Sequence, residues 1–407
     1  MKTCIITGIN GQLGQFMSKY LQDNEPDIQI IGTLRHKSYD KQPYIFDTTK
    51  VKFELMDLSD VHSITNLIIK YKPEYFVNTA ANAYVGESWK VPSQQIELNT
   101  LGVLHQLEAI RKHSPRTKYF NMGTSEEFGN DNNDGKLQNE TTLIDPKSPY
   151  GCAKACSRYL VNTYRRSYNL YALQGWTFNF ESELRGEKYV TKKITQNVAR
   201  IYHAIKNDQS FVPIKLGNLH SMRSWQFCGD VADGIWRQLN QEEYNGYLKS
   251  NFEDANFHYQ HDGQNPKSNL WESQWLSKNI KPYVMSARNC HSIMDFVEVA
   301  FKYSGINELC KQKHGYGDFH WYGDTMKYGE TKKDPLASYY WSEIGEMGEK
   351  FTYRLVEVDK EFIRPHDVSY LNGDASLIEK ELGWKSTLSF EQLVERMIKW
   401  DIANYKP

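Results

Sequence analysis

Thr7-Gly8-Ile9-Asn10-Gly11-Gln12-Leu13-Gly14 is the stretch of this 407-residue chain that decides its fold. It follows an apolar run at residues 3–7 and precedes a helical pattern at 12–23. Glycines spaced G-x-x-G-x-x-G between a strand and a helix allow a pyrophosphate to approach the backbone and the helix N-terminus without meeting a Cβ. The stretch therefore predicts a dinucleotide site formed by Gly8, Asn10, Gly11, Gln12, Leu13 and Gly14.

The sequence that follows this turn alternates between strand and helix patterns. Strands are expected at residues 28–34, 51–56, 75–81, 118–123 and 170–178, and helices at 61–72, 94–113 and 149–168. Alternation of this kind builds a parallel sheet with helices on both faces. The sequence predicts an α/β fold, a Rossmann-like doubly wound parallel sheet.

The alternation breaks down after about residue 180. A short strand is expected at 212–216, and helices at 191–207, 229–241, 292–304, 375–382 and 389–404. Two polar, aromatic-rich stretches, 242–280 and 310–350, show no clear periodicity and are interpreted as insertions. We expect a dinucleotide-binding domain of residues 1–180, to which the chain returns at about 212–240. A smaller, mainly helical substrate-binding lobe would comprise 181–211 and 241–407.

The charge balance excludes some classes of partner. The chain has 49 basic and 50 acidic residues, a formal net charge of -1, whereas nucleic acid and anionic membranes attract a basic excess. No apolar run is long enough for a transmembrane helix, and the start does not resemble a signal peptide. Six scattered cysteines without a C-x-x-C pair favour a reducing, cytoplasmic location. No metal site is expected, since His258, His261, His314 and His320 lack partner ligands.

The end of the second expected strand indicates which dinucleotide is bound. NAD sites usually have a carboxylate there for the ribose 2′-hydroxyl, but this chain has Gly32-Thr33-Leu34-Arg35-His36-Lys37. A guanidinium suits a 2′-phosphate, so we predict NADP, bound by Arg35. The alternative is that Arg35 and Lys37 are ordinary solvated loop charges. Asp57 and Leu58 would contact the adenine, and Ala80 and Ala81 would leave room for the ribose or nicotinamide.

Two further motifs carry chemistry. Tyr150 and Lys154 form Y-x-x-x-K in a helical pattern, and the spacing places both side chains on one helix face, where the ammonium lowers the pKa of the phenol. Thr124 and Glu126 follow the fifth expected strand, at the sheet edge that faces the ligand. Thr124 can bond a substrate hydroxyl, and Glu126 supplies a carboxylate that hydride transfer alone does not need. A solvated loop acid is the alternative for Glu126.

The glycine turn, the Thr124-Ser125-Glu126 motif and the Tyr150/Lys154 pair, in this order, resemble the extended short-chain dehydrogenase/reductase family. Within that family the chain is similar to the GDP-mannose 4,6-dehydratases over roughly residues 1–240 and 281–407. The matching segments include Val85-Gly86-Glu87-Ser88, Phe178-Asn179-Phe180-Glu181-Ser182, Arg185-Gly186-Glu187, Val190-Thr191-Lys192-Lys193-Ile194, Leu216-Gly217-Asn218-Leu219 and Arg364-Pro365-His366-Asp367-Val368.

The resemblance implies NADP-dependent dehydration of a GDP-sugar, with GDP-mannose first among the substrates. Tyr150 would be the base at the sugar 4-hydroxyl and Lys154 its partner, with Glu126 acting at C5 and C6 and Thr124 holding the sugar. Arg185 would reach the NADP of a neighbouring subunit, which implies a homo-oligomer, a dimer or tetramer. The substrate-binding positions are Ser88, Asn179, Val190, Lys193, Gly217, Arg223, Arg364 and Asp367.

The chain departs from the family pattern at three places: Asn82-Ala83, Leu184-Arg185 and Arg223-Ser224-Trp225. The family has Gln-Ser, two arginines and Arg-Asp-Trp there, so the sugar and the subunit contacts remain open. The alternatives are a dehydratase of another GDP-sugar such as a GDP-manno-heptose, or an epimerase or reductase of the same fold. A catalytically silent NADP-binding scaffold is the remote alternative, which the four residues Thr124, Glu126, Tyr150 and Lys154 disfavour.

Overall fold

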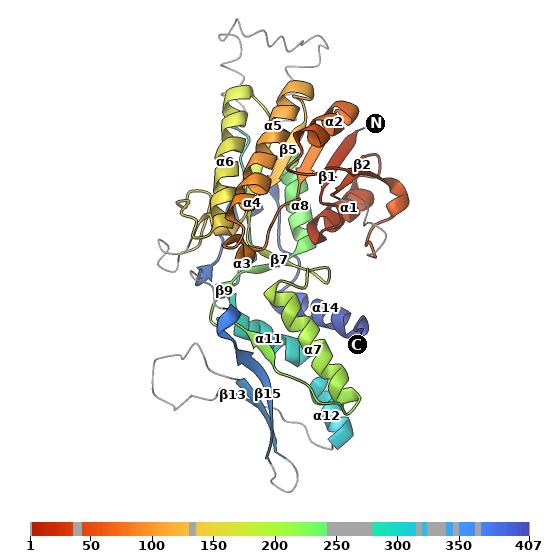
Figure 1. Ribbon diagram of the computed structural model, residues 1–407, viewed down its shortest axis with the longest axis vertical. Helices are drawn as coiled ribbons and strands as arrows, with labels where there is room; N and C mark the ends of the chain where they lie inside the picture. Colours follow the sequence, from red (N-terminus) through yellow and green to blue (C-terminus); the bar gives the residue numbers. More distant parts are fainter. Residues whose placement is uncertain are drawn as a thin grey trace, which may run out of the picture. The chain divides into compact units, whose positions relative to one another are not determined.

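Figure 1 shows the computed structural model, which describes residues 2–35, 43–129, 136–241, 279–314, 320–323, 339–344, 350–362 and 368–406. The chain forms two compact units. The first contains residues 1–180, 228–288 and 373–387, and the second contains 181–227, 289–372 and 388–407.

A parallel sheet of seven strands forms the centre of the first unit, in the order β11-β6-β5-β4-β1-β2-β3. This confirms the predicted Rossmann-like fold class. The strands are β1 (Thr3–Thr7), β2 (Gln29–Leu34), β3 (Val51–Leu55), β4 (Tyr75–Asn78), β5 (Lys118–Met122), β6 (Ala172–Thr177) and β11 (Val284–Met285).

Helices cover both faces of this sheet. The helices are α1 (Gln12–Asn24), α2 (Val61–Tyr71), α3 (Val85–Ser88), α4 (Pro92–Ile96), α5 (Gly102–His113), α6 (Pro149–Tyr168), α8 (Cys228–Leu239) and α13 (Ser376–Leu382). Apolar residues of α2, α5 and α6 share one core with Ile5, Phe76 and Tyr119 of neighbouring strands. Helix α1 contacts β1 and packs on α8, which itself contacts β5 and β6.

The helix predicted at 94–113 differs in one respect. The chain forms α4, a π-helical turn at Glu97–Leu101 and then α5. The wide turn contains Asn99, whose side chain accepts a hydrogen bond from the Asn82 N–H and donates one to the Asn82 carbonyl, both at 3.0 Å. Turns of this kind are frequent at functional sites. Here the turn holds the loop that follows β4.

The second unit combines helices with small sheets. Its helices are α7 (Val190–Lys206), α11 (Ile293–Tyr303), α12 (Ile306–His314) and α14 (Phe390–Ala403). One sheet has the order β12-β9-β16, formed by His291–Ser292, Met222–Arg223 and Tyr370–Leu371. A second, β13-β14-β15-β8, contains His320–Gly323, Tyr339–Ile344, Lys350–Val358 and Ile214–Leu216. Trp225 of β10 (Trp225–Phe227) packs in the core against Phe296 and Phe390.

The division between the units differs from the predicted domain boundaries. Residues 214–216, expected in the dinucleotide-binding domain, pair in parallel with β15 of the second unit. Val284–Met285 and residues 373–387, expected in the lobe, belong to the first unit. The reason is pairing and packing: β11 extends the parallel sheet beside β6, and the Trp384 indole donates to the Asp230 carbonyl on α8 at 2.7 Å.

Sequence periodicity also missed strands β13 and β14 within 310–350, because both are short. Residues 242–278 lie outside the described residues. Within the described part of the chain, no helix combines the length and the apolar character needed to cross a bilayer.

Candidate active site

The glycine turn after β1 is shaped for a close backbone approach. Gly8 has a φ of 63°, a left-handed conformation that favours glycine. A Cβ on Gly14 would lie 2.5 Å from the Gly8 carbonyl oxygen and 2.6 Å from the Ile9 Cα, so no larger residue fits. Helix α1 begins at Gln12, and Gly11 at its N-cap brings no side chain that could cap it. The first backbone N–H groups of α1 therefore lie at a turn without bulky side chains, and such a helix N-terminus suits an anionic diphosphate.

A hydrogen-bond bridge places the loop after β4 beside this turn. The Thr7 hydroxyl donates to the Asn78 side chain at 2.6 Å and accepts from the Ala80 N–H at 3.0 Å. A Cβ on Gly8 would lie 3.1 Å from the Ala80 Cα, so the two loops are in contact. Among the predicted cofactor residues, the structure thus brings Gly8 and Ala80 together, with Ala81 next in the chain.

Three other predicted cofactor residues of the turn have defined positions. Leu13 is buried in the core. The Asn10 carbonyl accepts a hydrogen bond from the Gln15 side chain at 3.3 Å. The Gln12 side chain donates to the Phe180 carbonyl at 3.1 Å, within the same unit.

The ends of β2 and β3 lie at the same sheet edge, because Thr7 pairs with Thr33 and Leu34 pairs with Leu55. Arg35 is exposed directly after β2. Asp57 accepts hydrogen bonds from the Ser59 N–H at 2.9 Å and the Ser59 hydroxyl at 2.7 Å. Its neighbour Leu58 is buried, and a Cβ on Gly102 would lie 3.0 Å from the Leu58 carbonyl oxygen. His36 and Lys37 lie outside the described residues.

A short 3-10 turn, Ser125–Glu127, follows β5 and carries the predicted carboxylate. Thr124 is its N-cap: the hydroxyl accepts from the Glu126 N–H at 3.3 Å, and the Thr124 N–H donates to the Glu127 side chain at 2.9 Å. Thr124 is 9% exposed and Glu126 is 8% exposed. The turn thus holds both residues at the edge of the core, with a small exposed surface each.

Helix α6 packs directly against this turn. Ser148 caps the helix by accepting from the Gly151 N–H at 3.0 Å, and Pro149 occupies its first turn. A Cβ on Gly151 would lie 2.6 Å from the Glu126 carbonyl oxygen. Tyr150, the residue before Gly151, is therefore placed beside the Glu126 turn.

Lys154 lies one helical turn beyond Tyr150 and is almost completely buried. Its ammonium donates to the Met122 carbonyl at the end of β5, at 2.9 Å. Burial lowers the pKa of Lys154 to about 8, while the charge of Glu127 raises it and that of Arg158 lowers it. The structure thus brings Thr124, Glu126, Tyr150 and Lys154 together on β5, its following turn and α6.

Two predicted substrate positions also lie in the first unit. Ser88 is buried at the end of α3, and its hydroxyl donates to the Val85 carbonyl at 2.6 Å. The Asn179 Oδ1, on β7 (Asn179–Glu181), is buried without a hydrogen-bond partner among the described residues. A buried amide oxygen without a partner is costly and indicates a ligand or water contact.

The second unit holds Val190, Lys193, Gly217 and Arg223. Val190 begins α7, and the Lys193 ammonium lies 3.3 Å from the centroid of the Phe362 ring. A Cβ on Gly217 would lie 2.5 Å from the Phe362 carbonyl oxygen, so Lys193 and Gly217 meet at Phe362. Burial lowers the pKa of Lys193, against the opposing charges of Asp359 and Glu361. Arg223 is 7% exposed and donates to the Met222 carbonyl at 2.9 Å.

Arg185 contacts groups of its own chain. Its Nε lies 3.1 Å from the Glu181 carboxylate, and its guanidinium lies 3.5 Å from the centroid of the Tyr189 ring. Arg364 and Asp367, the remaining predicted substrate residues, lie outside the described residues. So do His258 and His261, and the described part of the chain contains no group of three or more metal-ligating side chains.

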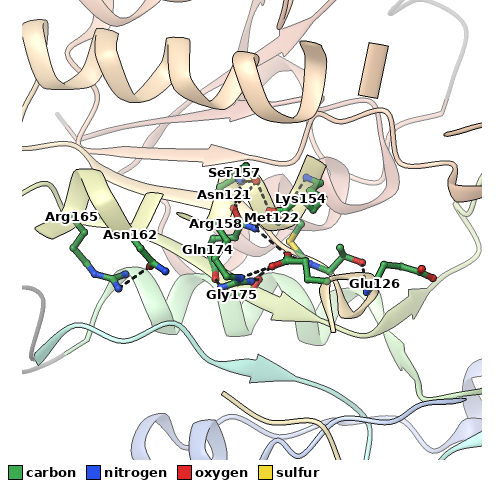
Figure 2. A network of polar contacts seen from close by, with 12 residues as sticks. Asn121, Met122, Glu126, Lys154, Ser157, Arg158, Asn162, Arg165, Gln174 and Gly175 are labelled. Atoms are coloured by element: carbon green, nitrogen blue, oxygen red, sulfur yellow. Dashed lines mark hydrogen bonds and ion pairs between the residues drawn. The ribbon is translucent and has the colours of Figure 1, made fainter. Parts of the chain in front are cut away.

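Sequence reasoning overlooked Glu127 and Arg158. Both are buried, and they form an ion pair beneath the Thr124–Glu126 turn, where Figure 2 shows Arg158 among Gln174, Gly175 and the strand β5 residues. The available signal was spacing: Tyr150, Lys154 and Arg158 recur every four residues and so share one face of α6.

Comparison with known proteins identifies the family of this chain. Residues 5–272 and 268–397 match the sequence profile of the family described as GDP-mannose 4,6 dehydratase. The chain belongs to this family. GDP-mannose 4,6 dehydratase 1 of Arabidopsis thaliana is 28% identical over 414 residues, which cover 98% of this chain and 90% of that protein. GDP-mannose 4,6 dehydratase of Homo sapiens is 26% identical over 413 residues, covering 98% and 91%.

Solved structures share the fold of this GDP-mannose 4,6 dehydratase family member. The dTDP-glucose 4,6-dehydratase of Bacillus anthracis, in complex with NAD, superposes with a TM-score of 0.65 at 16% identity, covering 99% of this chain and 97% of that one. RMD from Pseudomonas aeruginosa, complexed with NADPH, superposes with a TM-score of 0.66 at 13% identity, covering 99% and 100%. At such identities the likeness concerns the fold.

Proposed function

We propose that this protein catalyses the NADP-dependent dehydration of a GDP-sugar, converting GDP-mannose to GDP-4-keto-6-deoxymannose. The observation that carries the proposal is the contact between the Glu126 backbone carbonyl and the start of α6, which supports a shared site for Glu126 and the Tyr150/Lys154 pair. Membership of the GDP-mannose 4,6 dehydratase family supports the same reaction and substrate. A carboxylate beside a tyrosine base suits an elimination, because a proton must leave carbon and a hydroxyl must leave as water.

The first unit fits a bound nicotinamide dinucleotide. The fit rests on the space that Gly8 and Gly14 leave at the turn and on the glycine at the start of α1. Arg35 after β2, in place of a carboxylate, supports NADP. We assign the cofactor contacts to the predicted set, Gly8, Asn10, Gly11, Gln12, Leu13, Gly14, Arg35, Asp57, Leu58, Ala80, Ala81, Tyr150 and Lys154.

In the proposed reaction, NADP when bound supplies a reversible hydride acceptor for the sugar. Tyr150 takes the proton of the sugar 4-hydroxyl, and the Lys154 ammonium favours the phenolate. The 4-keto group that results acidifies C5, so Glu126 removes the C5 proton and delivers a proton to the 6-hydroxyl, which leaves as water. Thr124 orients the sugar through its hydroxyl. The hydride taken from C4 is returned to C6, and C5 takes up the equivalent of the proton released from the 4-hydroxyl, so no external reductant is consumed.

Substrate binding would use cations of an otherwise neutral chain. We propose Lys193 and Arg223 as partners of the diphosphate, because both are basic and partly or wholly buried. Ser88, Asn179, Val190, Gly217, Arg364 and Asp367 complete the proposed substrate set. Arg185 is proposed to act toward a neighbouring subunit of a homo-oligomer, a dimer or tetramer, in the cytoplasm.

The test is direct. Purified protein incubated with GDP-mannose and no added reductant should release GDP-4-keto-6-deoxymannose, detected by mass spectrometry as a loss of 18 Da, the mass of the water eliminated. Absence of product with GDP-mannose, but product with another GDP-sugar such as a GDP-manno-heptose, would move the assignment to that sugar.

The role of Glu126 has a separate prediction. Glu126→Gln should still transfer hydride between C4 of the sugar and NADP but should lose water at least 100-fold more slowly, in line with the loss of a general acid–base group. Reduced cofactor would be followed by absorbance and water loss by mass spectrometry. Glu97→Gln, on the π-helical turn, is the matched control, and normal dehydration by Glu126→Gln would contradict the assigned role.

A further inference from the structure

The Glu127 carboxylate is completely buried and connects the turn that carries Glu126 to strand β6 and helix α6. It accepts from the Thr124 N–H at 2.9 Å and from the Gln174 side chain at 3.1 Å, and it pairs with the Arg158 guanidinium. The Thr124 N–H lies at the start of this turn, so the Glu127 carboxylate fixes the backbone at Thr124, two residues before Glu126.

Arg158 connects this carboxylate to strand β6. Its guanidinium donates to Glu127 and to the Gln174 and Gly175 carbonyls, and it lies 3.5 Å from the centroid of the Trp176 ring. Its side chain is 2% exposed. The planar fork thus spans the turn after β5 and the backbone of the next strand, which a lysine could not do.

The same group of residues also holds α6. The Gln174 side chain donates to the Lys154 carbonyl at 2.9 Å, and the Ser157 hydroxyl has two acceptors within reach, the Lys154 carbonyl at 2.8 Å and the Gln174 side-chain oxygen at 3.0 Å. Figure 2 shows Lys154, Ser157, Arg158 and Gln174 gathered in this network, with Glu126 at its edge. One connected set of bonds therefore reaches both halves of the proposed acid–base site.

Gly123 lies close to the Glu127–Arg158 ion pair and leaves no room for a side chain. A Cβ at this position would lie 2.2 Å from the Gly175 carbonyl oxygen, 2.7 Å from the Arg158 guanidinium and 3.0 Å from the Glu127 carboxylate. Any side chain at residue 123 would displace the ion pair. The space between β5 and β6 is thus filled by the Glu127–Arg158 contact.

We infer that Glu127 and Arg158 are positioning residues for the dehydration, which set the distance between the Thr124–Glu126 turn and the Tyr150/Lys154 face of α6. The inference rests on the proposed function. Neither residue touches the reacting atoms in this assignment. A buried ion pair contributes little net stability, and its replacement by apolar residues is often neutral. We therefore attribute the Glu127–Arg158 pair to positioning of the turn relative to α6.

Two variants separate positioning from folding. Glu127→Gln keeps the size of the side chain and an acceptor for the Thr124 N–H but removes the charge. The double variant Glu127→Leu/Arg158→Leu avoids an isolated buried charge, so it should fold with an unfolding midpoint near that of the wild type. We expect each to lower kcat for GDP-mannose at least tenfold while KM changes less than twofold. Asp233→Asn, which removes an Arg237 ion pair in the same unit, is the matched control.

The pH profile supplies a charge-specific readout. The charges that act on Lys154 are Glu127, on the turn after β5, and Arg158, on its own helix. Without the Glu127 charge, the alkaline limb of kcat/KM should move to lower pH, and Asp233→Asn should leave it in place. A folded double variant with wild-type kcat would overturn the inference, as would a Glu127→Gln profile identical to that of the wild type.

Hydrogen exchange tests the same inference without turnover. Amides of residues 123–128 should exchange at least tenfold faster in Glu127→Gln than in the wild type, while those of β1 are unchanged. If the wild-type protein released no product from any GDP-sugar, the proposed function would fail and this measurement alone would decide the positioning role. Unchanged exchange at 123–128 would then refute it.

Discussion

Lys154 shows how burial tunes a single residue. Its pKa is lowered from 10.5 to about 8 by burial, so the unfolded chain binds more protons than the folded one between these two pH values. Charged Lys154 therefore destabilises the fold below pH 8, and the destabilisation disappears as the pH rises toward 10.5. The full effect corresponds to about 3 kcal/mol, at roughly 1.4 kcal/mol per pKa unit.

This gives a stability prediction for the apo-protein. Lys154→Met should gain stability relative to the wild type at pH 7, and the gain should shrink by about 2 kcal/mol or more at pH 10. Urea denaturation of both proteins at the two pH values measures the difference. Lys302→Met, on α11, is the control. A gain that is independent of pH would contradict the assigned origin of the shift.

Arg35 determines the cofactor in our proposal. Because a guanidinium can bond the 2′-phosphate through charge-assisted bonds, Arg35→Ala should weaken NADPH binding about 10- to 100-fold and leave NADH binding nearly unchanged. Fluorescence titration with the two dinucleotides measures both. Lys19→Ala, on the exposed side of α1, is the control. Equal losses for NADPH and NADH would show that Arg35 does not read the 2′-phosphate.

At the residue scale, the proposed site residues could be picked out from the sequence, whereas the residues that support them could not. Tyr150 and Lys154 were found by helical spacing, and Thr124 and Glu126 by their place after an expected strand. Arg158 and Glu127 were missed because each is unremarkable alone. Their ion pair depends on strand β6, whose backbone carbonyls accept hydrogen bonds from Arg158, and nothing in the sequence indicates that these carbonyls are acceptors.

The turn between β1 and α1 is the element on which the first unit depends most. Gly14→Ala would bring a Cβ within 2.5 Å of the Gly8 carbonyl oxygen, so the strand–helix turn must open. We expect a lower unfolding temperature and at least tenfold weaker NADPH binding, measured by calorimetry and titration. At Gly186 an added Cβ would meet only the Tyr189 ring at 3.5 Å, so Gly186→Ala is the control. Unchanged binding by Gly14→Ala would contradict the close-approach argument.

Among the elements, long periodic segments were predicted well. Strands β1 to β6 and helices α1, α2 and α6 lie within a few residues of their expected positions, because each has a full apolar face. The π-helical turn could not be predicted, since its extra residue is stabilised by Asn82, which is distant in sequence. Strand β11 was missed because two residues are too few for a pattern.

At the scale of the whole molecule, the sequence predicted two interleaved parts but not where the chain changes between them. The boundaries depend on long-range pairing: β8 joins β15, and β11 joins β6. Neither partner is near in sequence, so local periodicity holds no information on them. The predicted fold class is confirmed, and the two compact units change at residues other than the expected 212 and 241.

The interleaving of the two units affects how the protein responds to proteolysis. The chain passes between the units after residues 180, 227, 288, 372 and 387. A protease that cuts one of these connections leaves the others intact, so nicked protein should migrate as a single species until denaturant is added. Neither unit is encoded by one continuous segment, and no single truncation yields either of them whole. For recombinant work, a tag inserted in a surface loop is therefore preferable to any attempt at dissecting the chain.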